Sequence, residues 1–533
     1  MTTTPRAFFT LDRGAATLGA ALVAFVEGRW RLLAARAAPA DEEPESLLAG
    51  LVREVSAVEP DLVPDGDGWR GWTRVESRTL PPRRAVVAGP SERSTAALSR
   101  VLLMDGWRVV ARVTSDRASM LEAAAALRDP DLQLVAIAAP EGLSGADRSA
   151  LLDLLAFVAA AAELRDDVPV LVAGPAAGGR PQLPPGRVRR AHGVGDASVA
   201  ADELVPRPAD GREGFLRSIA SLAALLDLRV EGVEIGLDAG ARVMATPDGV
   251  MRRVVRADAA LLPPEALDDQ AMLDSIALWS PLADDPFSVA DRLRNLRVAP
   301  WRDAAGDGAR LRLAAARAAL ERLEVTWQEI ARDGAGGPAT GASMSDPVPL
   351  TAPDLLVAGG GAFACAPAPA VALALVDTLR RPGALALAYD HARVLGPLGV
   401  LDSERDRRRM LADLLEDLLV PLGSAILVPG LRPGHKGELR VTAEGATTTL
   451  TLAPGAVQVV DLPPGLAASV QVDSPDDLYV GARARRVAFE VTGGLGGLLV
   501  DTRDIPLRLP ERPDRRRDYL DAWQRPLWPG VDA

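Results

Sequence analysis

Two short Asp-x-Gly segments are the residues of this sequence best suited to phosphate chemistry. Asp12 and Gly14 lie between two apolar runs near the start of the chain, and Asp238 and Gly240 repeat the arrangement in its middle. Glycine lets a backbone bend tightly enough for its N–H groups to face phosphate oxygens. A carboxylate beside such a turn can hold Mg²⁺, usually through water molecules. The pattern predicts Asp12 and Asp238 as metal-holding and catalytic carboxylates.

A third glycine-rich element follows a predicted strand late in the chain and precedes a predicted helix. Its residues carry no side chains that would block a nucleoside, which makes ATP with Mg²⁺ the expected ligand. The predicted nucleotide-binding residues are Gly14, Thr17, Gly240, Gly359, Gly360 and Gly361. An alternative stays open at all three places. The aspartates can simply hydrogen-bond their own backbone in hairpin turns, and the glycine triplet can be a loop hinge.

The elements around the two turns predict the fold that would position them. Strands are expected over 6–11 and 20–26 around the first turn, and over 232–237 and 242–245 around the second. Two such hairpins followed by a late glycine cluster are the layout of the duplicated actin-like, or ribonuclease H-like, nucleotide-binding fold. The predicted class is therefore α/β.

Three other regions have their own patterns. Strand-like and helical runs alternate over 83–175, which indicates a doubly wound, Rossmann-like parallel sheet. Short strands with turns from residue 437 onward predict a small β-sandwich or barrel. Residues 333–349, rich in Gly and Pro, predict a flexible loop. The predicted domains are a first actin-like half (1–82), an inserted α/β segment (83–190), a second actin-like half (191–432) and a β-rich C-terminal domain (433–533).

Composition excludes several classes of function. The 533 residues carry a formal net charge of -12, and an acidic chain repels phosphate backbones, so nucleic acid is not an expected partner. One cysteine, Cys365, and three histidines far apart in sequence argue against a disulfide and against a zinc site. We see no secretory leader and no apolar run long enough to span a bilayer, so we expect a cytoplasmic protein without membrane contact.

Several segments resemble one known family. They are "FFTLDRGAATLGAALV" at the N-terminus, the stretch from "DLLVAGGGAF" to "YDHARVLGPLGVL" over 354–401, and "VTGGLGGLLVDTRDIPLRLP" over 491–510. In these the chain resembles the glutamate mutase L proteins, which accompany adenosylcobalamin-dependent carbon-skeleton mutases. The resemblance implies an actin-like ATPase fold that binds ATP and Mg²⁺. It also implies a chaperone-like, reactivating role, with the cobalamin-dependent mutase subunits as partners.

The sequence departs from that family at both turns. Where the family carries Ser, Thr and then Lys, this chain has Ala15, Ala16, Thr17, Leu18 and Gly19, and Ala241, Arg242 and Val243 follow the second turn. Each lost charge-assisted phosphate contact costs about 1.5 to 3 kcal/mol. Arg242 can be interpreted as a replacement cation or as a surface arginine on a strand. Whether the chain is an enzyme, with weak or lost ATPase activity, stays open.

Three functions remain at this point. The first is an ATP-dependent reactivating factor with Asp12 and Asp238 near Mg²⁺. The second is a degenerate pseudo-ATPase scaffold that binds its partner without hydrolysis. The third is a small-molecule kinase of the same fold, which would need a catalytic carboxylate that the sequence does not identify.

Overall fold

The computed structural model divides the chain into two compact units. The larger comprises Met1–Leu80, Ala209–Arg252 and Asp258–Ala533, and the smaller comprises Pro81–Pro208 and Arg253–Ala257. The structure describes residues 7–63, 66–114, 124–163, 165, 167–175, 187–206, 210–263, 270–282, 286–300, 304–334 and 352–528. Residues 335–349 of the predicted loop lie outside the described residues. The four predicted domain boundaries stay a prediction.

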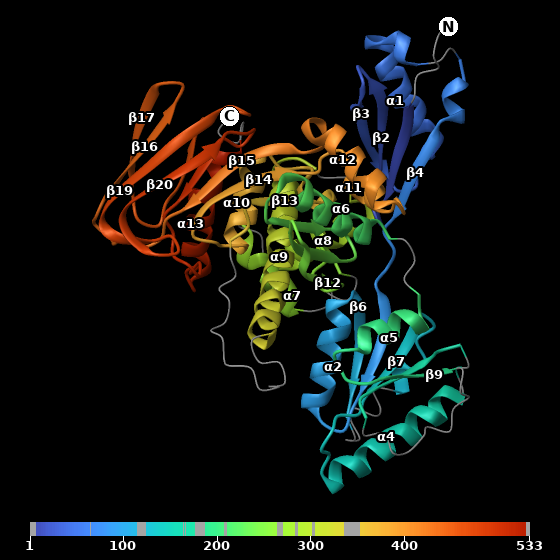
Figure 1. Ribbon diagram of the computed structural model, residues 1–533. Helices are drawn as coiled ribbons and strands as arrows, with labels where there is room; N and C mark the ends of the chain where they lie inside the picture. The colour runs from blue at the N-terminus through green and yellow to red at the C-terminus, as the bar shows by residue number, and fades with distance from the viewer. Residues whose placement is uncertain are drawn as a thin grey trace. The chain divides into compact units, whose positions relative to one another are not determined.

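The first sheet of the larger unit contains the first Asp-x-Gly turn. Its order is β3-β2-β1-β4, and its strands are β1 (Ala7–Arg13), β2 (Thr17–Val26), β3 (Arg29–Pro39) and β4 (Thr73–Arg78) (Figure 1). Strand β1 runs antiparallel to β2 and parallel to β4. Glu27 and Gly28 both have positive φ, as a tight two-residue hairpin between β2 and β3 requires. Helix α1 (Pro44–Val58) buries Leu48 and Leu51 against Phe9 and Leu11 of β1.

The second sheet repeats this topology around the second turn. Strand β10 (Val230–Ile235) runs antiparallel to β11 (Gly240–Thr246) and parallel to β13 (Leu355–Gly359). The whole sheet has the order β12-β11-β10-β13-β14-β15-β21-β18. Its other strands are β12 (Gly249–Arg256), β14 (Gly383–Tyr389), β15 (Val420–Leu427), β18 (Val457–Val460) and β21 (Leu498–Asp501). The shared order and direction confirm the predicted duplicated, actin-like α/β fold.

Several further helices pack around the sheets of the larger unit. They are α6 (Gly211–Leu226), α7 (Gln270–Trp279), α8 (Pro286–Val298), α9 (Gly306–Gly334), α10 (Ala368–Thr378), α11 (Leu395–Gly399) and α12 (Glu404–Leu418). Helices α6 and α11 touch through their backbones, because a Cβ added at Gly399 would lie 1.7 Å from the carbonyl oxygen of Gly214. Since α6 also packs on β10 and β11, this contact ties α11 to the second half.

The C-terminal region is rich in strands, as predicted, but not all of them form one separate body. Strands β16 (Gly437–Ala443), β17 (Ala446–Leu452), β19 (Ala467–Tyr479) and β20 (Arg483–Thr492) make a sheet of order β17-β16-β19-β20. Its inner residues, such as Leu439 and Val470, share a core with Ile426 of β15 and Val500 of β21. Helix α13 (Pro513–Gln524) docks on this body, and Trp523 donates its indole N–H to the carbonyl oxygen of Gly455 at 3.2 Å.

The smaller unit is a parallel sheet with helices on both faces, as the alternating pattern predicted. The order is β6-β5-β7-β8-β9, and each strand runs parallel to its neighbours. The strands are β5 (Arg83–Ala88), β6 (Trp107–Val113), β7 (Leu132–Ala138), β8 (Val170–Ala173) and β9 (Val188–Ala191). Helices α2 (Glu92–Met104) and α5 (Ala197–Leu204) cover one face and α4 (Gly145–Glu163) the other (Figure 1).

Candidate functional site

The first Asp-x-Gly turn carries a paired aspartate. Asp12 lies opposite Ser77 in the β1–β4 register, and its Oδ1 accepts a hydrogen bond from the Ser77 hydroxyl at 2.8 Å. Its Oδ2 forms an ion pair with Nη2 of Arg393 at 2.6 Å, and Nη1 of Arg393 donates to the Thr17 hydroxyl. We call Asp12, Thr17, Ser77 and Arg393 the Asp12 cluster. Both oxygens of Asp12 therefore have partners within the chain.

Arg393 comes from a segment that Asp390 shapes. Asp390 follows β14, and its carboxylate accepts the backbone N–H groups of Val394 and Leu395 at 3.0 and 3.2 Å. Arg393 itself has a positive φ of 56°, which is uncommon for a residue with a long side chain. Burial alone would lower the pKa of Arg393, but the Asp12 carboxylate outweighs that effect and raises the pKa above its usual value. The guanidinium is therefore held charged beside Asp12.

The glycines of the first turn make room for this side chain. A Cβ added at Gly14 would lie 3.0 Å from Nη2 of Arg393, and one added at Gly19 would lie 3.1 Å from its Cδ. The N–H of Gly14 donates to the carbonyl oxygen of Thr17 at 2.9 Å and closes the turn. The space beside Gly14 and Gly19 is thus filled by the Arg393 side chain. The assignment of Gly14 to a phosphate contact stays a prediction.

The second turn is built differently. Asp238 follows β10, and its Oδ1 lies 3.1 Å from Nη2 of Arg297, with 26% of each side chain exposed. Gly240 packs closely, because an added Cβ would lie 2.4 Å from the carbonyl oxygen of Ala259. Asp238 therefore directs its carboxylate to α8, and among the described residues no hydrogen bond or ion pair joins it to the Asp12 cluster.

Both interpretations of Arg242 are wrong. Its side chain is fully buried and pairs with Glu231 at 2.6 Å and with Glu324. The guanidinium also stacks on the Trp327 ring, 4.4 Å from its centroid. A buried arginine needs such partners, because an unpaired charge in the core is costly. Arg242 is a core residue joining β11 to α9, and it faces neither solvent nor phosphate.

The glycine triplet lies between the two halves. A Cβ at Gly359 would lie 2.7 Å from the ring of Phe215, and one at Gly360, where φ is 88°, would lie 2.4 Å from the carbonyl oxygen of Ile235. Gly361 faces the first turn, since its Cβ position is 3.8 Å from Oγ1 of Thr17. The fold therefore brings Gly361 to the first predicted turn and packs Gly360 against the strand that leads to the second.

Three acids near the Asp12 cluster were not predicted from the sequence, the buried Asp390 and the partly buried Glu234 and Asp210. Burial raises the pKa of Asp390 to about 7 and that of Glu234 to about 7, and in both cases the Asp12 charge adds to the effect. Burial also raises the pKa of Asp210, against the pull of Arg212. Asp390 could have been found as the acid that directly follows the apolar run over 384–389. Glu234 lies inside a strand pattern and gave no such signal.

Direct Mg²⁺ binding does not fit this arrangement. Each predicted metal-holding aspartate is paired with an arginine, Asp12 with Arg393 and Asp238 with Arg297. Among the described residues, no group of three or more His, Cys, Asp and Glu is placed to hold a metal ion. A cation on Asp12 would compete with a guanidinium already in contact with it. The assignment of Asp12 and Asp238 as catalytic and metal-holding residues stays a prediction.

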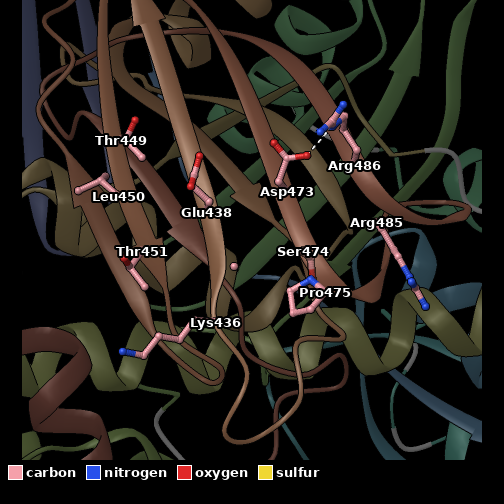
Figure 2. A pocket seen from close by; sticks show the side chains of 11 residues that line it. Lys436, Glu438, Thr449, Leu450, Thr451, Asp473, Ser474, Pro475, Arg485 and Arg486 are labelled. Carbon is pink, nitrogen blue, oxygen red and sulfur yellow. Dashed lines mark hydrogen bonds and ion pairs between the residues drawn. The ribbon is translucent and has the colours of Figure 1, made fainter.

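A separate depression of about 740 Å³ lies on the C-terminal sheet. Figure 2 shows Lys436, Glu438 and Asp473 around it, and Asp473 pairs with Arg486. Neighbouring His435 pairs through Nδ1 with Asp476 at 2.8 Å. The depression takes no residue from the two Asp-x-Gly turns, so it is a different surface from the predicted nucleotide site.

Comparisons with known proteins give only distant likenesses. No family model matches the chain. No curated protein matches it either. None of the helices in the described part of the chain is long and apolar enough to cross a bilayer.

Several solved structures are similar in part to the fold of this chain. Component A of (R)-2-hydroxyglutaryl-CoA dehydratase from Acidaminococcus fermentans is 8% identical over 75% of this chain and 98% of its own, with a TM-score of 0.25. The activator of 2-hydroxyisocaproyl-CoA dehydratase from Clostridium difficile, solved with bound ADPNP, is 9% identical over 76% and 98%, at 0.26. An exopolyphosphatase from Cytophaga hutchinsonii is 8% identical over 67% of each chain, at 0.21. The fold assignment rests instead on strand order and direction.

Proposed function

We propose that this chain is a nucleotide-binding accessory protein of an adenosylcobalamin-dependent carbon-skeleton mutase of the glutamate mutase type. The observation that carries the proposal is the approach of Gly361 to Thr17, with 3.8 Å between the Cβ position and Oγ1. This approach unites the first predicted phosphate turn with the glycine triplet, although the two are far apart in sequence. Such convergence is what a nucleotide site between duplicated halves needs.

The part of the chain that most resembles the glutamate mutase L family supports the same proposal. Residues 354–401 form β13, the glycine triplet, α10, β14 and α11, and they include Asp390 and Arg393. The residues that carry the resemblance are therefore also those that complete the Asp12 cluster. A resemblance spread over unrelated surface positions would have given no such support.

Nucleotide would act through the protein's own two halves. A nucleotide supplies phosphate charge that Arg393 and the N-terminal turn can bind, and Gly361 adds no side chain beside that turn. Differential affinity for two arrangements of the halves would then bias the mutase between closed and open states. Release of damaged cobalamin requires the open state, and this is the role that the resemblance implies.

The test uses the full chain and the purified subunits of a glutamate mutase-type enzyme from the same source. We expect co-elution on size exclusion and faster recovery of a cobalamin-inactivated mutase when ATP and fresh adenosylcobalamin are added. Beside it, calorimetry with ATP measures nucleotide binding directly. Absence of a complex and of recovery would remove the mutase role, and absence of binding at millimolar ATP would remove the nucleotide site.

A second candidate is a pseudo-ATPase scaffold that binds its partner without hydrolysis. The specific observation in its favour is that both predicted catalytic aspartates carry arginine partners. A phosphate-release assay with the mutase present separates the two candidates. Release that rises with added mutase favours a working ATPase, whereas complex formation without release favours the scaffold.

A further inference from the structure

Arg393 takes up the position in which a cation would balance Asp12. Only 12% of its side chain is exposed, against 13% for Asp12, so the pair is largely shielded from water. Its Nη2 contacts Asp12 and its Nη1 donates to Thr17, while Nε is buried with no hydrogen-bond partner. Two of its three nitrogens thus contact residues of the first half, and the third is enclosed by the protein.

The local backbone is arranged to hold this side chain there. Arg393 keeps a positive φ of 56°, and Gly14 and Gly19 leave the space that its guanidinium and Cδ fill. Non-glycine residues keep such backbone conformations only where the surroundings impose them, and these places are often functional. Three independent features, namely backbone, space and charge, therefore converge on the same side chain.

The surrounding charges favour one resident cation. Glu234 interacts electrostatically with Asp12, Asp210, Arg212 and Arg393, and Asp390 interacts with Asp12 and Arg393. A divalent ion directly on Asp12 would have to displace Arg393 or stand beside its charge. A guanidinium already carries a planar set of N–H donors that suits phosphate oxygens.

We propose that Arg393 is the built-in cation of this site, and that it binds nucleotide phosphate directly so that binding needs no divalent metal ion. The proposal rests on the proposed function of the Asp12 cluster as part of a nucleotide site. It assigns to Arg393 the phosphate role that a lysine and a metal ion would otherwise share. Thr17 and Asp12 act as positioning residues that orient the guanidinium.

The first experiment measures ATP binding to the full chain by calorimetry, once with excess EDTA and once with millimolar MgCl₂. We expect dissociation constants that agree within about threefold, because the protein supplies the cation itself. A requirement for Mg²⁺ of tenfold or more would overturn the inference and leave the nucleotide site intact. Binding in neither buffer would remove the nucleotide site itself, so the two failures are distinguishable.

The second experiment changes Arg393. Arg393→Ala should weaken ATP binding in EDTA by about tenfold to 150-fold, the range expected for a lost charged hydrogen bond. Mg²⁺ should restore part of this loss, since Asp12 is then free of its arginine. Unchanged affinity in EDTA would overturn the inference.

Matched variants guard against a general loss of folding. Arg31→Ala removes a part-buried ion pair between β3 and Asp417 of α12, away from the cluster, and this variant should bind ATP like the unaltered chain. Arg393→Lys keeps the charge and should retain more affinity than Arg393→Ala. If Arg393→Ala does not melt cooperatively, the comparison of EDTA with MgCl₂ on the unaltered chain decides the inference alone.

Discussion

The two Asp-x-Gly turns share a sequence pattern and a strand topology, but they differ in what surrounds the aspartate. In the first, Asp12 is 13% exposed and held by Ser77 and Arg393. In the second, Asp238 is 26% exposed and meets Arg297 at 3.1 Å. The same short pattern thus occurs with two kinds of ion pair. The Asp12–Arg393 pair is largely buried and joins the two halves, whereas the Asp238–Arg297 pair is partly exposed and lies at the end of a helix. Turn geometry follows the pattern, whereas charge environment does not.

The largest expected difference between the turns concerns the loss of the aspartate. Asp12→Ala should lower the free energy of unfolding by about 3 to 5 kcal/mol, because Arg393 is left buried without its partner. Asp238→Ala should cost no more than about 1 kcal/mol, because its pair is better solvated. Urea unfolding of both variants measures this. Equal losses would show that the two environments are energetically alike.

A second expected difference is a dependence on pH around the first turn. The folded chain raises the pKa of Asp390 and of Glu234 to about 7, above the ordinary range for an unfolded chain. Their contribution to stability is therefore full below about pH 4 and is lost as pH rises toward about 7. The free energy of unfolding of the unaltered chain should fall between about pH 5 and 7.5. In Asp390→Asn this fall should be smaller by on the order of 1 to 3 kcal/mol.

Chemical denaturation across that pH range checks the effect. Glu54→Gln serves as the control, because Glu54 lies half exposed in a surface pair with Arg36. Parallel curves for Asp390→Asn and the unaltered chain would contradict the raised pKa of Asp390.

The smallest expected difference concerns the glycines. Gly14→Ala should cost about 1 to 2 kcal/mol, because its Cβ would lie 3.0 Å from Nη2 of Arg393 and push the guanidinium from Asp12. Gly236→Ala, whose Cβ would lie 3.3 Å from the carbonyl oxygen of Ala239, should cost less than about 1 kcal/mol. Thermal melting of the two variants compares them. A larger loss at Gly236 would reverse the order inferred for the two turns.

Much of the fold could be predicted from local patterns. The hairpins around Asp12 and Asp238, the long helix α9 and the alternating strands and helices of the smaller unit all follow from periodicity and turn residues. The predicted strand-rich C-terminal region is also present, but β18 and β21 belong to the central sheet. Strand pairing of this kind depends on contacts distant in sequence, which a local pattern does not contain.

The candidate site was predictable only in part. Gly361 and Thr17 were both proposed from their sequence contexts, and they face each other. Arg393 was missed because it lies 376 positions from Thr17 and follows no recognised spacing. Arg242 was misjudged because its neighbour Glu231 lies across a strand pair, while Glu324 belongs to a distant helix.

The sequence by itself determined where the chain bends and which segments become strands or helices, because glycine turns and apolar periodicity act between near neighbours. The tertiary structure alone decided which charges meet. Asp12 gained Arg393, Asp238 gained Arg297 and Arg242 was drawn into the core. The physical reason is that an ion pair depends on distance in space and on shielding from water, and both are set only when the two halves pack together.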